Sequence, residues 1–394
     1  MKFAHISDSH LGSWRQPELQ FLNMQSFITA IDTCINENVE FVLFAGDLFD
    51  SAFPQIEILK ETFRQFRKLK ESGIKSYVIA GSHDYSVSGK TFLDVLEKAG
   101  LCEICKYEED DEKKVIILKP IIHKTYHIYG YPGKKSGLEL EDLRKVRIME
   151  PYKSYFRILM LHTTLKEVTE GLDIDSIDIS ELPHADYYAL GHIHVKFEKD
   201  LKGKFVVYGG PTFPNNFKEL EDLKYGRFYI IEINGYTKIK EKQIKLKEVE
   251  LIEIELNNSL NGTEKILSEL KKRELRDKIV LLKIYGKLKE GKISDIKFQE
   301  IEEYLKKEGA YSFLKNTSKL EISSKEINVE VSEMEKIEEV IFEKYEKENP
   351  SALNKFIFPL MESLNIEKND GETLNTFQSR LLSEVTKVLD LDLQ

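Results

Sequence analysis

The chain has 394 residues, of which 41% are hydrophobic and 32% charged, and its formal net charge is −10 at pH 7. This length allows two or three domains with sizeable cores, and the composition is that of a globular protein rather than a disordered one. No uncharged apolar run approaches the roughly 20 residues that span a bilayer. The short apolar run at the N-terminus meets Asp8 too early for a signal peptide. We therefore expect an intracellular protein without a membrane partner.

The three cysteines indicate a reducing compartment rather than a metal or disulfide framework. Cys102 and Cys105 form one Cys-x-x-Cys pair, and Cys34 is distant in sequence. A zinc site of this type needs a second pair, which the sequence lacks. The cysteines are therefore expected to be reduced and structural.

Residues 1–237 alternate short runs of β-branched and aromatic residues with stretches of helical period. The predicted strands are 2–6, 41–45, 76–80, 115–118, 127–129, 157–161, 187–190, 205–208 and 227–233. The predicted helices are 20–36, 55–71 and 91–98. Strand and helix alternate early and strands cluster later, which predicts an α/β domain with a mixed sheet or two packed sheets.

The segment 238–325 is rich in Lys and Glu, with 21 basic and 16 acidic residues. Strand patterns at 249–256 and 279–284 lie among helical patterns at 263–273 and 294–307, so a small α+β domain packed on the first is expected. Its excess of positive charge permits contact with a phosphate backbone. A solvated surface would explain the same charges.

Residues 326–394 carry 7 basic and 16 acidic residues, and amphipathic helices are predicted at 333–348, 352–364 and 373–389. Three such helices with little to bury against suggest a docking appendage. A small helical bundle packed on its own chain is the alternative.

Polar loops follow five of the predicted strands. They are Asp8-Ser9-His10, Gly46-Asp47-Leu48-Phe49-Asp50, Gly81-Ser82-His83-Asp84, His162 and Gly191-His192-Ile193-His194. Each loop alone is explained by a turn, a helix cap or a satisfied polar group. Together they place five of the nine histidines directly after apolar strands, whose carboxyl ends meet at the ligand-binding edge of an open α/β sheet. Carboxylates with imidazoles suit a pair of divalent ions such as manganese.

Within these loops the residue types suggest different roles. An ionised Asp47 beyond a wholly apolar strand is costly unless it is paired or metal-bound, and one carboxylate can bridge two cations. His83 could act as a general acid or orient a phosphate. Asp84 could hold the His83 ring in one tautomer. Ser82 offers only a neutral hydroxyl and is a poor metal ligand.

The order of these motifs resembles that of the calcineurin-like binuclear metallophosphoesterases. More narrowly, the chain resembles the SbcD-type double-strand-break repair nucleases, which include the meiotic-recombination nucleases of archaea and eukaryotes. Met-Lys-Phe-Ala-His-Ile-Ser-Asp-Ser-His-Leu-Gly, Gly-Asp-Leu-Phe-Asp, a cap-like domain and a helical tail carry this resemblance. It implies a four-layer αββα sandwich over 1–237, a DNA-binding α+β capping domain over 238–325 and a helical ATPase-docking segment over 326–394.

The resemblance also implies roles for single residues. One manganese ion would be held by Asp8, His10, Asp47 and His194, and a second by Asp47, Ser82, His162 and His192. His83 would be the catalytic histidine that assists the leaving oxygen, supported by Asp50 and Asp84. The chain departs from the family at Ser82, where the motif has Asn. It also departs at Asp50, where some relatives carry a histidine that touches substrate.

Two protein partners follow from the resemblance. A homodimer would form through helices 55–71 and 91–98, although the same apolar faces could simply cover the sheet. A coiled-coil, SMC-like repair ATPase would dock on the C-terminal helices through exposed apolar side chains. The candidate docking residues are Leu353, Phe356, Ile357, Leu360, Phe377 and Leu381.

The sequence therefore predicts an intracellular, nucleoid-associated, manganese-dependent nuclease that processes DNA breaks. It would degrade double-stranded ends and cut single strands within the ATPase complex. A phosphodiesterase or phosphatase with non-DNA substrates is the first alternative. A scaffold with a weakened site, supported only by Ser82, is the second.

Overall fold

The computed structural model describes residues 1–85, 89, 91–110, 112–134, 137–149, 156–169, 174–322, 345–347, 349–351, 353–369 and 374–389. The chain forms two compact units, Met1–Ile322 and Ser323–Gln394. None of the helices in the described ranges has the length and apolar character that crossing a membrane requires.

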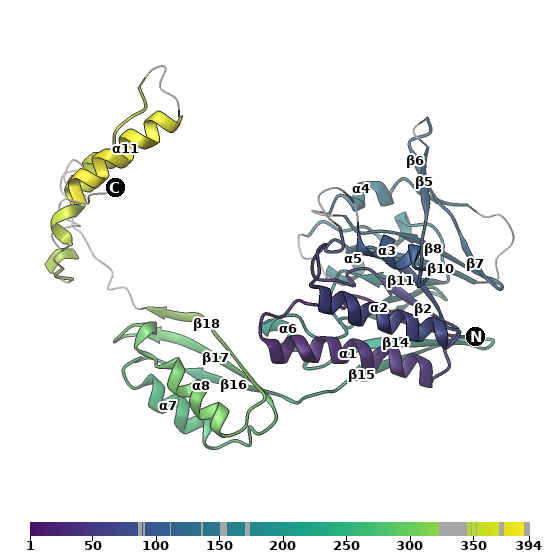
Figure 1. Ribbon diagram of the computed structural model, residues 1–394, viewed down its shortest axis with the longest axis horizontal. Coiled ribbons are helices and arrows are strands. Elements are labelled where there is room, and N and C mark those ends of the chain that lie inside the picture. The colour runs from purple at the N-terminus through teal and green to yellow at the C-terminus, as the bar shows by residue number, and fades with distance from the viewer. Residues whose placement is uncertain are drawn as a thin grey trace. The chain divides into compact units, whose positions relative to one another are not determined.

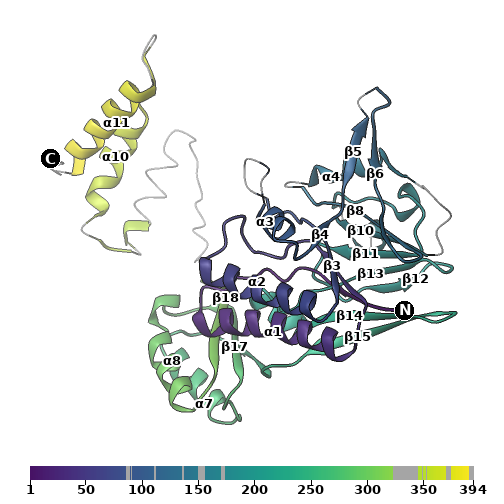
Figure 2. The same ribbon diagram turned by 45° about the vertical axis from the view of Figure 1, so that its right-hand side comes forward.

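Two six-stranded sheets form the centre of the first unit (Figures 1 and 2). The first sheet has the order β15 (Thr237–Ile244), β14 (Gly226–Ile233), β1 (Lys2–Ile6), β2 (Phe41–Ala45), β3 (Lys75–Ile79) and β4 (Glu103–Ile104). The second has the order β12 (Glu198–Asp200), β13 (Phe205–Tyr208), β11 (Tyr187–Gly191), β10 (Phe156–His162), β8 (Tyr126–Tyr131) and β7 (Ile121–His123). Of the two sheet arrangements that the sequence allowed, the structure has the two packed sheets.

Parallel pairing in both sheets determines where the functional loops lie. Strands β1, β2 and β3 pair in parallel, and so do β8, β10, β11 and β13. Phe41 and Tyr187 belong to the apolar core that the inner faces of the two sheets share. Because parallel strands end on the same side, the loops after β1, β2 and β3 leave one edge, and those after β10 and β11 leave one edge of the second sheet.

The outer layers cover the two sheets. Helices α1 (Pro17–Asn36) and α2 (Ile56–Glu71) run side by side over the first sheet, and α3 (Phe92–Lys98) extends this layer. The second sheet is covered by short helices α4 (Glu139–Leu143) and α5 (Lys166–Thr169) and by a small sheet of β5 (Tyr107–Asp110), β6 (Val115–Leu118) and β9 (Val146–Ile148). The predicted αββα sandwich is confirmed, and its fourth layer is partly β-structure.

The apolar faces of α2 and α3 mostly serve this fold. Ile58, Phe66 and Leu69 of α2 and Leu96 of α3 are buried in the core against the first sheet. For these four residues, covering the sheet explains the apolar face and a dimer contact is not needed, because a helix that covers a sheet must bury such a stripe.

The capping region packs on α1, on α6 (Phe217–Leu223) and on the loop after β1, but it differs from its predicted class. It contains β16 (Val249–Glu255), α7 (Gly262–Leu270), β17 (Ile279–Leu288), α8 (Phe298–Lys307) and β18 (Ser312–Ile322). All three strands are parallel, so the arrangement is α/β rather than the predicted α+β. The reason is that each helix provides the crossover that a parallel pair requires.

One face of this small sheet packs on α7 and α8. The other face contacts Trp14, Leu19 and Leu220, so the predicted packing against the first part of the chain is confirmed. The proposed boundary between 237 and 238 lies at the start of β15, which pairs with β14 throughout its length. The three-domain division itself stays a prediction.

The second unit contains the turn of 3-10 helix Asn354–Phe356, α10 (Ile357–Leu364) and α11 (Leu374–Leu389), and α10 contacts α11. These elements correspond to the predicted helices 352–364 and 373–389. The predicted helix 333–348 lies outside the described residues apart from 345–347.

Candidate metal centre

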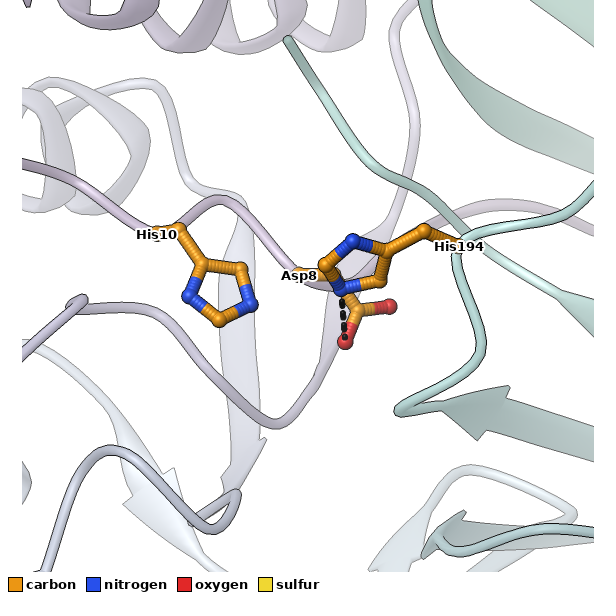
Figure 3. A group of neighbouring side chains, drawn as sticks. All are labelled: Asp8, His10 and His194. Carbon is orange, nitrogen blue, oxygen red and sulfur yellow. Dashed lines mark ion pairs between the residues drawn. The ribbon is translucent and has the colours of Figure 1, made fainter. Parts of the chain in front are cut away.

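Five strand ends bring acidic and imidazole side chains to one place. Ligand atoms within 4.8 Å of one another occur in three groups: Asp8, His10 and His194; Asp47, His162 and His192; and His10, Asp50 and His83. Figure 3 shows the first group, in which Asp8 and His10 come from the loop after β1 and His194 from the loop after β11. The two sheets therefore contribute to the same site.

Asp8 and Asp47 occupy the buried interior of the site. His194 Nε2 lies 3.6 Å from Asp8 Oδ1, the ion pair that Figure 3 marks. Asp47 Oδ2 lies 3.1 Å from His162 Nε2 and 3.5 Å from His10 Nε2. Since Asp47 approaches histidines of both groups, its carboxylate would be a ligand shared by two cations if each group held one.

The ring orientations of three histidines are set by acceptors behind them. His10 Nδ1 lies 3.2 Å from Asp50 Oδ1, His162 Nδ1 lies 3.0 Å from the Ala45 carbonyl, and His194 Nδ1 lies 3.1 Å from Glu219 Oε1. When Nδ1 donates in this way, Nε2 is left as the ligand atom. Nε2 of His10 and of His162 are buried and make no hydrogen bond within the described part of the chain. Buried imidazole nitrogens beside carboxylates fit a divalent cation.

The protonation equilibria reflect the concentration of negative charge. Burial alone would raise the pKa of Asp8, but the hydrogen bond and charge of His194 outweigh burial and lower it to about 2. Burial would lower the pKa of His162 and His194, but Asp47 and Asp8 raise these values to about 9 and about 10, with Glu219 contributing at His194. Carboxylates that hold protons on two buried imidazoles would equally stabilise bound cations.

The loop after β3 places its three polar residues differently from one another. Ser82 Oγ lies 3.5 Å from Asp47 Oδ2, so it borders the second group at long range. His83 is exposed, its backbone N–H donates to Asp47 Oδ1 at 2.8 Å, and its Nδ1 lies 2.9 Å from the Asp50 carbonyl oxygen. The His83 ring is thus oriented by Asp50.

Asp84 does not orient His83, contrary to the prediction. Its buried carboxylate accepts backbone N–H groups from Gly81 at 2.8 Å, Leu48 at 3.3 Å and Phe49 at 3.0 Å. These contacts join the loops after β2 and β3. Burial and the neighbouring Asp47 raise the pKa of Asp84 to about 6. Asp84 therefore supports the site through the backbone of both loops.

Four candidate metal ligands have unusual backbone conformations. Asp8, His10, Asp47 and His192 have φ angles of 51°, 40°, 48° and 96°. Non-glycine residues adopt this region rarely and at some cost, which the surrounding structure must offset at these four positions. Gly81 permits the close approach of the loops, because a Cβ there would lie 2.2 Å from Asp47 Oδ1.

Comparison with known families agrees with this geometry. Residues 1–196 match the calcineurin-like phosphoesterase family. The chain belongs to this family. The family implies a binuclear divalent metal site and metal-dependent phosphoester hydrolysis, and the residues described above have the donor types that such a site requires.

Curated relatives of this phosphoesterase extend the match. The DNA double-strand break repair protein Mre11 of Archaeoglobus fulgidus is 25% identical over 97% of this chain and 85% of its own length. The protein of the same name from Methanocaldococcus jannaschii is 28% identical over 73% of this chain and 77% of its own length. An uncharacterized metallophosphoesterase of Bacillus subtilis, YhaO, is 30% identical over 60% of this chain. The resemblance to double-strand-break repair nucleases that the sequence motifs indicated is confirmed.

Glu219 is the site residue that the sequence did not predict. It lies on α6 (Phe217–Leu223), where Asn216 and Glu219 form reciprocal hydrogen bonds at the start of the helix. The Asn-x-x-Glu spacing is a signal for helix capping. It gives no indication that the carboxylate also reaches His194 of this phosphoesterase, since that contact depends on the tertiary fold.

Proposed function

We propose that this phosphoesterase is a manganese-dependent nuclease that processes DNA double-strand breaks, degrading double-stranded ends and cutting single strands. The observation that carries the proposal is the position of Asp47 between two groups of histidines at the joined edges of two sheets. The repair proteins that align with 97% and 73% of the chain indicate DNA as the substrate.

The proposed ligands divide between two ions. Asp8, His10, Asp47 and His194 would hold the first. Asp47, His162 and His192 would hold the second, with Ser82 as a weak or water-mediated neighbour. When bound, such a pair of ions stabilises charge on a phosphodiester and lowers the pKa of a water molecule.

His83 is the proposed catalytic residue. Its ring is exposed at the rim of the site, and the Asp50 carbonyl holds Nδ1. With Nδ1 donating to this carbonyl, Nε2 carries a proton only when the ring is an imidazolium. From that form Nε2 would give its proton to the leaving oxygen of a phosphodiester, and the ring would return to its neutral state. Asp50 serves both histidines of the third group, since its carboxylate contacts His10 and its carbonyl contacts His83.

The second unit is the proposed docking site for a coiled-coil, SMC-like repair ATPase. None of the residues of α10, from Ile357 to Leu364, is fully buried. Leu353 is 69% exposed, and Phe356, Leu360, Phe377 and Leu381 are only partly covered. Amphipathic helices with incompletely covered apolar faces fit a groove on a partner. The capping region, with its excess of basic residues, would contact DNA, and the complex would then be associated with the nucleoid.

An end-labelled duplex tests this proposal. Wild-type protein is incubated with the DNA in manganese, in magnesium or in a chelator, beside His83→Ala. We expect manganese-dependent degradation that falls by a factor of roughly 10² to 10⁴ in the variant, the usual contribution of a general acid.

The control is His184→Ala, which removes an exposed histidine outside the site and should leave cleavage unchanged. Turnover of a small phosphodiester without DNA cleavage would instead identify a phosphodiesterase with another substrate. Cleavage of neither substrate would favour a scaffold.

A further inference from the structure

Helix α6 contacts the metal centre through one residue. Glu219 Oε1 lies 3.1 Å from His194 Nδ1, on the side of the imidazole that faces away from Asp8. The same carboxylate accepts the Asn215 backbone N–H at 2.9 Å and the Asn216 side-chain amide at 2.6 Å. Its position is therefore fixed by the start of the helix, and His194 is oriented by a carboxylate that is not itself among the candidate metal ligands.

The next two residues of α6 contact the capping region. Leu220 is fully buried in the cluster that includes Ile279 and Leu281 of β17. Glu221 pairs with Lys283, also on β17, and both side chains are mostly buried. Successive residues of a helix point about 100° apart, so one short helix is held on one side by the metal centre and on another by the capping sheet.

We propose that α6 couples the capping region to the first metal site, with Glu219 as a positioning residue for His194. Because Glu219, Leu220 and Glu221 are consecutive in one helical turn, a shift of β17 against α6 moves the carboxylate that orients His194. DNA held by the capping region would then affect how firmly the first ion is bound. This proposal rests on the assignment of His194 to that ion in the proposed function.

Mn²⁺ alone is the probe for the positioning role. The wild type and the variants are titrated with Mn²⁺, and the free ion is measured by electron paramagnetic resonance. Loss of a carboxylate behind a metal-bound histidine typically weakens metal binding about 10- to 100-fold. We expect a loss in this range at one of two sites in Glu219→Ala. Glu219→Gln, which keeps an oxygen acceptor but loses the charge, should fall between that variant and the wild type.

The matched control is Asp222→Ala on the same helix, whose carboxylate pairs, among the residues that the structure describes, only with the exposed Lys218. It should bind Mn²⁺ as the wild type does. Thermal unfolding in chelator separates positioning from general destabilisation, since Glu219→Ala should lose Mn²⁺ affinity without a matching loss of melting temperature. Unchanged affinity in Glu219→Ala would overturn the positioning role.

The coupling is tested from the capping side. Lys283→Met removes the capping-side partner of Glu221, which also pairs with Lys218 on α6, and it does not alter the first two sheets. It should weaken the same Mn²⁺ site at least about twofold, the lower range for coupling between sites. Lys278→Met is its control, because Lys278 is similarly covered but pairs with Glu248 and Glu250 within the capping region. Wild-type affinity in Lys283→Met would overturn the coupling. None of these readouts depends on DNA cleavage, so failure of the nuclease proposal is distinguished from failure of this one.

Discussion

Asp47 connects several parts of the candidate metal site. It follows a wholly buried strand, adopts a positive φ, and contacts two histidines and the loop after β3. The sequence could predict its importance, because a carboxylate directly after an apolar strand needs compensation. The sequence could not predict the role of Glu219. Its contact with His194 joins residues 25 positions apart and depends on the tertiary fold.

We propose that Ser82 limits the affinity for the second ion. Its hydroxyl lies 3.5 Å from Asp47 Oδ2 and is shorter than the asparagine amide of the family motif. Ser82→Asn supplies an oxygen that can coordinate directly, so we expect Mn²⁺ affinity at the weaker of two sites to rise on the order of tenfold, the scale of effects seen when the surroundings of a metal site are altered. Isothermal titration with Mn²⁺ measures this, and an unchanged weaker site would show that position 82 does not limit binding.

Substitution of Asp84 is expected to lower the stability of the protein. Asp84→Ala leaves the backbone N–H groups of Gly81, Leu48 and Phe49 without their acceptor. A buried donor without a partner costs about 1–3 kcal/mol, so the free energy of unfolding should fall by roughly 3 kcal/mol or more. Urea unfolding in chelator measures this loss. Asp84→Asn, which keeps one oxygen, should lose less, and an alanine variant as stable as the wild type would contradict the role assigned to Asp84.

At the level of elements, strands with strong apolar runs were predictable and those without were not. Strands β1, β2, β6 and β13 have their predicted bounds. The two-residue β4 and the exposed, charged β12 have no pattern to recognise. Strand β15 alternates Lys with other residues and belongs to the first sheet through its pairing with β14, not through its composition. A local segment of sequence indicates which residues of a strand are buried, but it does not indicate which other strand it pairs with.

The proposed docking site on the C-terminal helices can be tested with charged substitutions. Phe377→Glu with Leu381→Glu places two charges on the apolar face of α11, where both side chains are only partly covered. Pull-down with the coiled-coil ATPase should lose the complex, while Mn²⁺-dependent nuclease activity of the isolated protein remains. Ser383→Glu, at an exposed position of the same helix, should bind as the wild type does. Retained binding in the double variant would locate the docking site elsewhere.

At the level of the whole molecule, the predicted four layers and the five-loop site depend on each other. Parallel strands in both sheets bring His10, Asp47 and His83 from one sheet to His162 and His194 from the other. The motif order predicted this convergence. The sequence could not predict that the capping strands are all parallel, because the helices between them read equally well in either class.

The predicted homodimer can be tested at exposed apolar residues of α2 and α3. Most of the apolar face of α2 is buried in the core, so the exposed apolar residues of the two helices, Ile56 at 73% and Val95 at 47%, are better candidates for a dimer contact. Ile56→Glu with Val95→Glu should convert a dimer to a monomer in light scattering coupled to gel filtration. Tyr236→Glu, at a residue 70% exposed in the β14–β15 turn, is the control. A dimer that survives the double change would exclude this contact.

Anomalous X-ray scattering from crystals grown with Mn²⁺ would show whether the site holds two ions, because it locates each ion independently of activity. We expect two peaks in each chain, one contacted by Asp8, His10 and His194 and the other by His162 and His192, with Asp47 touching both. The second peak should be the weaker in the wild type and should strengthen in Ser82→Asn. A single peak, or a second ion away from His162 and His192, would contradict the two-ion centre.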